Sequence, residues 1–219
     1  MAGLAAARGL AQSGVKVVLL EASGRVGGRV HTVRLAGSDL PAEVGAEFVH
    51  GRPPELMALI EEAGLILFER EGDFFSFEDG RLKKTDWEES AFDVLEKLPE
   101  EGDRPFAEFL AEQKLPEKVA ARARSYVEGF NAADANVIGT AALRKQQEAE
   151  DAIEGDRLFR IREGYDRLPL FLLDCFLAAG GRAHLETAVT AIEWKRGEVR
   201  VQTANAELPE VKAQSAVIA

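Results

Sequence analysis

The sequence predicts an α/β protein in which a mainly helical segment interrupts an α/β domain. Three observations support this class: a helix pattern followed by a strand pattern near the N-terminus, an acidic and helix-rich middle, and strand patterns that return in the last third. A chain of 219 residues is long enough to bury a substantial core. We therefore expect residues 1–60 and 156–219 to be two segments of one domain, and residues 61–155 to belong to a second domain.

The first segment begins with half of a βαβ unit. Residues 3–13 are rich in alanine and leucine, which favours a helix, and Gly14 is a suitable residue to end it. The run VKVVLL at residues 15–20 follows at once and is typical of a buried strand in a parallel sheet. A helix that leads directly into such a strand indicates an α/β domain.

The middle of the chain carries the negative charge. Residues 1–60 hold 6 Lys and Arg against 5 Asp and Glu, residues 61–155 hold 12 against 24, and residues 156–219 hold 9 against 9. Near-neutral ends around an acidic block favour one domain interrupted by another, although solvated helix faces give the same pattern.

Helix patterns fill this acidic block. The segment PFAEFLAEQ places Phe106, Phe109 and Leu110 on one face. The segment LPEKVAARARSYVEGF begins with Pro116, which the first turn of a helix tolerates. The block is therefore expected to be mainly helical.

Strand patterns return with LFRIREGY at residues 158–165. A helix is expected from about residue 165 to 179, and residues 183–204 resemble two strands joined by the turn KRGE. Cys175 lies in the expected helix among leucine and phenylalanine residues, so we expect it to pack in the core. As the single cysteine it cannot form an internal disulfide.

Charge and hydropathy exclude several partners. A net charge of −11 disfavours nucleic acid and anionic membrane surfaces, because binding phosphate groups requires a basic surface. No apolar run approaches the roughly 20 residues that cross a bilayer, and the first residues lack a signal-peptide pattern. A cytoplasmic protein is therefore expected, with no prediction of its oligomeric state.

The first strand pattern ends at a carboxylate, Glu21. In a dinucleotide-binding unit, an acidic residue at the end of the second strand accepts hydrogen bonds from ribose hydroxyls, roughly 20 residues after a glycine-rich turn. Gly3 lies 18 residues before Glu21 and opens the expected helix, so it fits the third glycine of such a turn. The first two glycines and the first strand are not in the sequence.

A second glycine-rich element follows Glu21. Gly27 and Gly28 allow a ligand to approach the backbone, and an arginine beside them can neutralise phosphate with its fork of donors. Arg25 and Arg29 flank this pair. A surface turn with two solvated arginines would also contain the tripeptide GGR (27–29). The combination of this tripeptide with Glu21 nevertheless favours a phosphate-binding role.

Four blocks, in chain order, resemble the flavin-containing amine oxidase family, which includes monoamine and polyamine oxidases. They are LLEASGRVGGRVHTV (19–33), AEVGAEFVHG (42–51), YVEGFNAADAN (126–136) and IEGDRLFRIREGYDRL (153–168). Phytoene desaturases and protoporphyrinogen oxidases share the GGR block, whereas the second and third blocks favour amine oxidases. The resemblance implies a glutathione-reductase-type FAD-binding (Rossmann-like) domain, incomplete here, with an inserted and mainly helical substrate domain.

The resemblance assigns expected contacts to FAD. Glu21 is expected to hold the adenosine ribose, and Gly28 with Arg29 to lie along the pyrophosphate and ribityl chain. Arg25 is either a ligand or a structural arginine. Ser23 stands where relatives often have an arginine. The extra contact that this arginine would make to the adenosine side of FAD is therefore not expected here. The complete set of expected cofactor-binding residues is Gly3, Glu21, Arg25, Gly28, Arg29, Gly45, Ala46, Glu47 and Val189.

The other assignments depend on the same resemblance. Gly45, Ala46 and Glu47 are expected to present backbone to the flavin ring, and Val189 to contact adenine through its main chain. His50 is expected to face a small-molecule amine substrate. No residue is assigned as a catalytic acid or base or as a metal ligand. Trp87 and Trp194 are expected to be core or interface residues.

The implied reaction removes hydride from a carbon that bears an amine, giving an imine, with dioxygen reoxidising the flavin to form hydrogen peroxide. The last residues, KAQSAVIA, resemble the strand that re-enters the FAD domain. We therefore expect a fragment, truncated at both ends, that carries little or no FAD and is inactive alone. The alternatives are another GGR-type flavoenzyme and a non-catalytic remnant.

Overall fold

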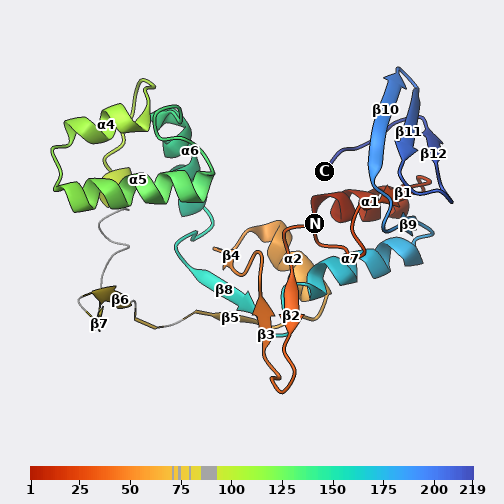
Figure 1. Cartoon of the computed structure of the whole chain (residues 1–219), viewed down its shortest axis with the longest axis horizontal. Coiled ribbons are helices and arrows are strands. Elements are labelled where there is room, and N and C mark those ends of the chain that lie inside the picture. Colours follow the sequence, from red (N-terminus) through yellow and green to blue (C-terminus); the bar gives the residue numbers. More distant parts are fainter. Residues whose placement is uncertain (71, 74, 79, 85–92) are drawn as a thin grey trace. The chain divides into compact units, whose positions relative to one another are not determined.

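A computed structural model describes residues 1–219 except 71, 74, 79 and 85–92, and it divides into two units (Figure 1). Unit 1 comprises Met1–Val49, Pro54–Phe68 and Phe159–Ala219. Unit 2 comprises His50–Pro53 and Glu69–Leu158. Each unit is compact, and the predicted division into an FAD-binding domain and a substrate domain stays a prediction.

Unit 1 contains three small sheets and three helices among its described residues. Its helices are α1 (Ala2–Gln12), α2 (Pro54–Glu62) and α7 (Arg167–Ala178). Its parallel pair is β1 (Val18–Leu20) with β9 (Arg182–His184), and its antiparallel pair is β2 (Thr32–Arg34) with β3 (Pro41–Glu43). A three-stranded antiparallel sheet is formed by β10 (Val189–Lys195), β11 (Glu198–Thr203) and β12 (Glu210–Ala213) (Figure 1).

Unit 2 is mainly helical. Its helices are α4 (Phe106–Glu112), α5 (Glu117–Asn131) and α6 (Thr140–Asp151), and a hairpin joins β6 (Phe75–Glu78) to β7 (Arg81–Lys84). The remaining strands form a sheet in the order β4 (Val49–His50), β8 (Leu158–Ile161) and β5 (Leu67–Glu69). The chain passes from one unit to the other within each of these three strands and also between Pro53 and Pro54.

The predicted half of a βαβ unit is confirmed. Helix α1 spans the alanine-rich segment, and Gly14, with φ of 83°, follows its C-cap residue Ser13. Strand β1 follows and pairs in parallel with β9, with Val18 opposite Arg182. The strand is half-buried rather than fully buried, because among the described residues it has one neighbouring strand.

The helical predictions for the middle are also confirmed. Phe106, Phe109 and Leu110 are buried in one cluster with Val127 and Leu143, so α4 packs its predicted face against α5 and α6. Pro116 is the N-cap of α5 rather than its first helical residue. The hairpin of β6 and β7 was not predicted, since its second strand, RLKK, is exposed and strongly charged.

In unit 1, helix α7 appears within the predicted range and packs along α1. Its Leu172 and Phe176 are buried, and Cys175 is half-buried. The turn KRGE joins β10 to β11 as expected. No helix in the described part of the chain is long and apolar enough to cross a membrane.

Two predictions about the last third are only partly met. Of the expected strand KAQSAVIA (212–219), Lys212 and Ala213 belong to β12, whereas residues 214–219 are in no strand. Trp194 was expected in the core or at an interface; its 79% exposure on β10 contradicts the core alternative, and the interface alternative stays a prediction. Trp87 falls within residues 85–92 and lies outside the described residues.

Candidate functional site

Glu21 lies where the parallel pair β1 and β9 ends. Its N–H donates to the His184 carbonyl at 2.9 Å, and its own carbonyl accepts from the Thr187 N–H at 2.8 Å. Its carboxylate atom Oε1 accepts from the Ser23 N–H and the Ser23 hydroxyl, both at 2.8 Å. The carboxylate therefore stands at the carboxyl end of parallel strands, the edge at which α/β sheets bind ligands.

The glycine-rich turn is held by one of its two arginines. Gly27 and Gly28 have φ of 111° and 61°, a region that favours glycine. The Arg25 guanidinium donates to the carbonyls of Gly28 and Val30, each at 2.9 Å. These bonds support the structural alternative for Arg25, and its contact with a ligand stays a prediction.

Arg29 differs from Arg25 in its surroundings. Its side chain is exposed, and across the described residues its guanidinium has no hydrogen-bond or ion-pair partner. An unpaired guanidinium beside an open glycine turn can bind a phosphate through two N–H groups at once. Of the two arginines, Arg29 is therefore the one whose guanidinium has no protein partner among the described residues.

The glycine-rich turn and the segment GAE lie side by side. The Ala46 N–H donates to the Arg29 carbonyl at 2.9 Å, and the Val44 N–H donates to the His31 carbonyl at 2.9 Å. A Cβ atom on Gly45 would lie 2.1 Å from the Arg29 carbonyl oxygen, so only glycine fits there. The fold thus joins two blocks that the sequence analysis assigned to one ligand.

Glu47 uses its side chain elsewhere. Its Oε1 pairs with Arg160 Nη2 at 3.2 Å, and both side chains are partly exposed. The Glu47 side chain is therefore engaged within the protein, as is the Ala46 N–H. The expectation that this segment contributes main-chain groups to a ligand stays a prediction.

A polar network that the sequence analysis missed supports this segment. The Thr32 hydroxyl donates to Glu43 Oε2 at 2.6 Å, and the Tyr165 N–H donates to Glu43 Oε1 at 2.9 Å. The Asp166 N–H donates to Thr32 Oγ1 at 3.0 Å. Glu43 therefore ties the strand before Gly45 to the residues that precede α7. No local pattern shows this, because the partners lie 122 residues apart in the chain.

The same network contains an ion pair. Arg34 donates to both carboxylate oxygens of Asp166, at 2.9 and 3.0 Å. Burial raises the pKa of Asp166, but the hydrogen bonds and charge of Arg34 outweigh it, so the pKa lies below its usual 3.8. The charged carboxylate is therefore the form that the folded chain favours.

Gly3 and Val189 complete the predicted set. A Cβ on Gly3 would lie 3.3 Å from Ala219 Cβ, so the residue that packs closely against Gly3 is Ala219. Val189 begins β10, two residues after Thr187, which bonds to Glu21, and its side chain is 44% exposed. Its backbone is thus held near the Glu21 end of the site.

His50 belongs to an aromatic cluster in unit 2. Its ring meets that of Phe130 edge-on, with centroids 5.6 Å apart, and Tyr126 stacks on Phe130 at 5.5 Å. Phe130 is 47% exposed at the end of α5. These rings present an aromatic surface that can attract a cation through its π-electrons.

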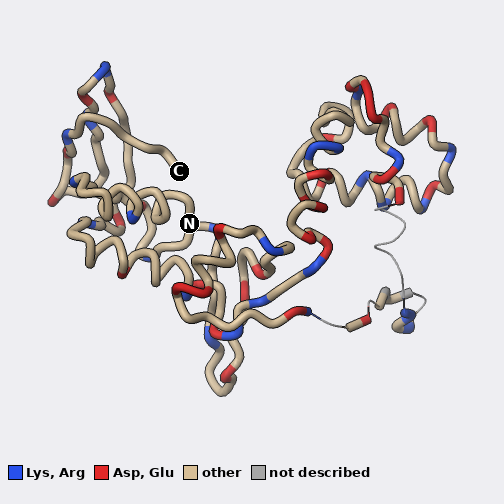
Figure 2. Tube along the Cα trace, turned by 180° about the vertical axis from the view of Figure 1, so that it is seen from behind, with Lys and Arg blue, Asp and Glu red and all other residues tan. Residues whose placement is uncertain are grey.

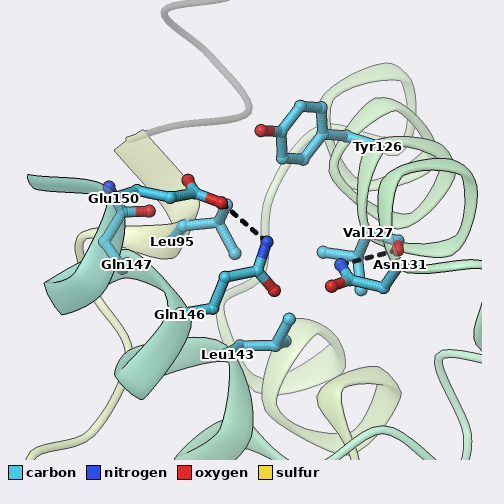
Figure 3. A pocket seen from close by; sticks show the side chains of 8 residues that line it. All are labelled: Leu95, Tyr126, Val127, Asn131, Leu143, Gln146, Gln147 and Glu150. Atoms are coloured by element: carbon cyan, nitrogen blue, oxygen red, sulfur yellow. Dashed lines mark hydrogen bonds between the residues drawn. The ribbon is translucent and has the colours of Figure 1, made fainter. Parts of the chain in front are cut away.

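The cavity in unit 2 shown in Figure 3 is too small for a substrate. Its volume is about 10 Å³, room for roughly one water molecule. The Gln146 amide at its centre donates to Glu150 at 2.7 Å, and Asn131 donates to the Val127 carbonyl at 3.0 Å. We therefore treat it as a packing defect between α5 and α6.

Comparisons with known proteins identify the family of this chain. The family model described as flavin containing amine oxidoreductase matches residues 1–123 and 70–219. A segment of 75 residues is 41% identical to probable polyamine oxidase 4 of Arabidopsis thaliana, covering 33% of this chain and 15% of that protein. A segment of 69 residues is 42% identical to putrescine oxidase of Kocuria rosea, covering 32% and 14%.

Solved structures confirm the predicted fold class. Cyclohexylamine oxidase from Brevibacterium oxydans IH-35A superposes with a TM-score of 0.74 at 19% identity, covering 99% of this chain and 55% of that structure. Identity this low is evidence for the fold alone. The chain thus spans about half the length of the solved structure it matches.

Proposed function

This chain belongs to the flavin-containing amine oxidoreductase family. We propose that it functions as an FAD-dependent oxidoreductase that oxidises a small-molecule amine. The observation that carries the proposal is the backbone bond between Arg29 and Ala46, which joins the glycine-rich turn to the GAE segment. The relatives named polyamine oxidase and putrescine oxidase support an amine as the substrate. Dioxygen as the acceptor and hydrogen peroxide as the product are part of the proposal.

The residues present fit the adenosine and pyrophosphate parts of FAD. The cofactor needs an acceptor for ribose hydroxyls, a cation for phosphate and backbone that a ligand can approach. Unit 1 supplies the carboxylate of Glu21, the unpaired guanidinium of Arg29 and the positive-φ turn at Gly28. We propose that these three groups hold FAD and that Arg25 acts by fixing the turn.

FAD, when bound, supplies the redox chemistry by accepting the hydride. In our proposal, Gly45, Ala46 and Glu47 orient the flavin ring through their backbone, and Val189 contacts adenine in the same way. His50 lies three residues after Glu47 in the chain and faces the amine. No side chain is assigned to move a proton.

The charge of unit 2 supports a cationic substrate. Residues 61–155 hold 24 Asp and Glu against 12 Lys and Arg. Within this block, acidic residues outnumber basic ones on α4 and α6, whereas α5 has three basic residues and two acidic ones; Figure 2 shows both charges along the chain. Such an excess creates a negative potential that raises the local concentration of an ammonium ion. A protonated amine is the substrate class that this potential and the aromatic surface at Phe130 favour together.

Titration of FAD into the purified chain tests the cofactor assignment. We follow the adenine proton resonances of FAD by NMR, because this method detects weak binding. Glu21→Gln should weaken binding about tenfold, since a charged acceptor forms hydrogen bonds worth about 1.5–3 kcal/mol. Glu207→Gln, which removes an exposed carboxylate in the same unit, is the control and should change nothing. Equal affinity of the parent and Glu21→Gln would overturn the assignment.

Amine binding to unit 2 is tested without FAD. Putrescine added to the purified chain should shift the ring resonances of Phe130 and Tyr126, and butane-1,4-diol, which lacks the charge, should not. Phe130→Ala should weaken putrescine binding roughly two- to fivefold, the size of an exposed cation–π contact. Equal shifts with the diol would contradict the proposed role of this surface.

A further inference from the structure

Ser23 makes two hydrogen bonds to the same carboxylate oxygen. Its N–H and its hydroxyl both lie 2.8 Å from Glu21 Oε1. The hydroxyl is also 2.7 Å from the Arg25 carbonyl. A hydroxyl has one hydrogen to donate, and the charged carboxylate is the stronger of the two acceptors, so we assign that hydrogen to Glu21.

These two bonds fill one side of the carboxylate. Each carboxylate oxygen has two lone-pair positions, and Ser23 occupies both positions on Oε1. In the described residues, Oε2 has no hydrogen-bond partner. Glu21 is therefore held in one orientation, with one oxygen satisfied and the other available.

The backbone around this pair is fixed independently of the Ser23 hydroxyl. The Glu186 N–H donates to the Ser23 carbonyl at 3.0 Å. Bonds from Glu21 to His184 and from Thr187 to Glu21, at 2.9 and 2.8 Å, lie on either side of it. The chain at residues 21–23 is thus joined to residues 184–187 by three main-chain bonds, which remain when the Ser23 side chain is changed.

We propose that Ser23 is a positioning residue that orients Glu21, so that Oε2 is the atom that accepts a ribose hydroxyl. The inference rests on the proposed function, because it assumes that Glu21 meets the ribose of FAD. It gives Ser23 a role that its residue type alone does not suggest. An aligned acceptor binds more tightly because the side chain loses less rotational freedom when the ligand arrives.

The test compares two ligands that differ only in the ribose hydroxyls. ADP and 2′,3′-dideoxy-ADP are titrated into the purified chain, and the ratio of their dissociation constants is measured by NMR. A ratio cancels changes that affect both ligands equally, such as a general loosening of the fold. The variants are Ser23→Ala, Ser23→Thr, Glu21→Gln and the control Ser13→Ala, whose hydroxyl donates to the Gly9 carbonyl at the end of α1.

We expect the parent, Ser23→Thr and Ser13→Ala to prefer ADP by the same factor. Ser23→Ala should reduce this preference about fivefold, the effect of one hydrogen bond to a charged group, and Glu21→Gln should abolish it. An unchanged preference in Ser23→Ala, with the preference lost in Glu21→Gln, would overturn the role of Ser23 alone. An unchanged preference in Glu21→Gln, or none in the parent, would overturn the ribose assignment and the inference with it.

Discussion

At the scale of single residues, the two arginines around the glycine pair have different environments. Arg25 donates to the carbonyls of Gly28 and Val30, whereas Arg29 is exposed and has no side-chain partner among the described residues. The sequence could not separate them, because both lie next to glycines and the deciding bonds depend on the path of the turn. Glu21 was predictable, since a strand pattern and its end are local features.

Substitutions at the two arginines should therefore have different effects. Arg29→Lys should weaken FAD binding about tenfold and leave the melting temperature unchanged, because lysine supplies a point charge instead of a planar fork. Arg25→Ala should lower the melting temperature, since the carbonyls of Gly28 and Val30 lose their donor and the bond to Val30 is partly buried. The measurements are FAD titration and thermal unfolding. If Arg29→Lys binds FAD as tightly as the parent, Arg29 is only a surface residue.

At the scale of elements, the close approach of two segments fixes the centre of the proposed site. Gly45 packs against the Arg29 carbonyl, and the Ala46 N–H bonds to it. Behind them, Glu43 and Thr32 connect the β2–β3 hairpin to the residues before α7. The sequence predicted both segments as binding blocks, but their contact depends on pairing between strands and was not predictable from local pattern.

Gly45→Ala tests this contact. The new methyl group would overlap the Arg29 carbonyl, so we expect a loss of about 1–3 kcal/mol in the free energy of unfolding. Gly9→Ala is the matched control: nothing lies within 4 Å of its Cβ position in α1, and alanine there should stabilise by about 0.5–1 kcal/mol. Chemical denaturation measures both. Equal stability of Gly45→Ala and the parent would show that the segments are not in contact.

The Arg34–Asp166 pair predicts a dependence on pH. The pKa of Asp166 is lowered by folding, so the pair contributes stability above the usual value of 3.8 and loses it as pH falls through the folded value. Between about pH 5 and about pH 3, the parent should lose more unfolding free energy than Asp166→Asn, by less than about 1 kcal/mol because Arg34 is partly exposed. Asp39→Asn, an exposed control, should behave as the parent. Identical slopes for the parent and Asp166→Asn would contradict the assignment.

At the scale of the whole molecule, sequence patterns predicted the α/β class and most long elements. Helices α1, α4, α5 and α7 and the β10–β11 hairpin follow from local periodicity and turn residues. The pairing of β1 with β9 was not predictable, since Val18 and Arg182 come from distant parts of the chain. The family match covers both ends of the sequence, so the fold and the motifs agree on one family.

The central claim is that the motifs from Glu21 to Glu47, together with Val189, form one FAD-binding surface. Titration of FAD into the isotope-labelled chain, with every backbone amide followed by NMR, tests it most directly. The account predicts that the amides of Glu21, Ser23, Gly28, Arg29, Ala46 and Val189 shift together with one dissociation constant. Shifts confined to other parts of the chain, or different constants for these amides, would contradict the claim.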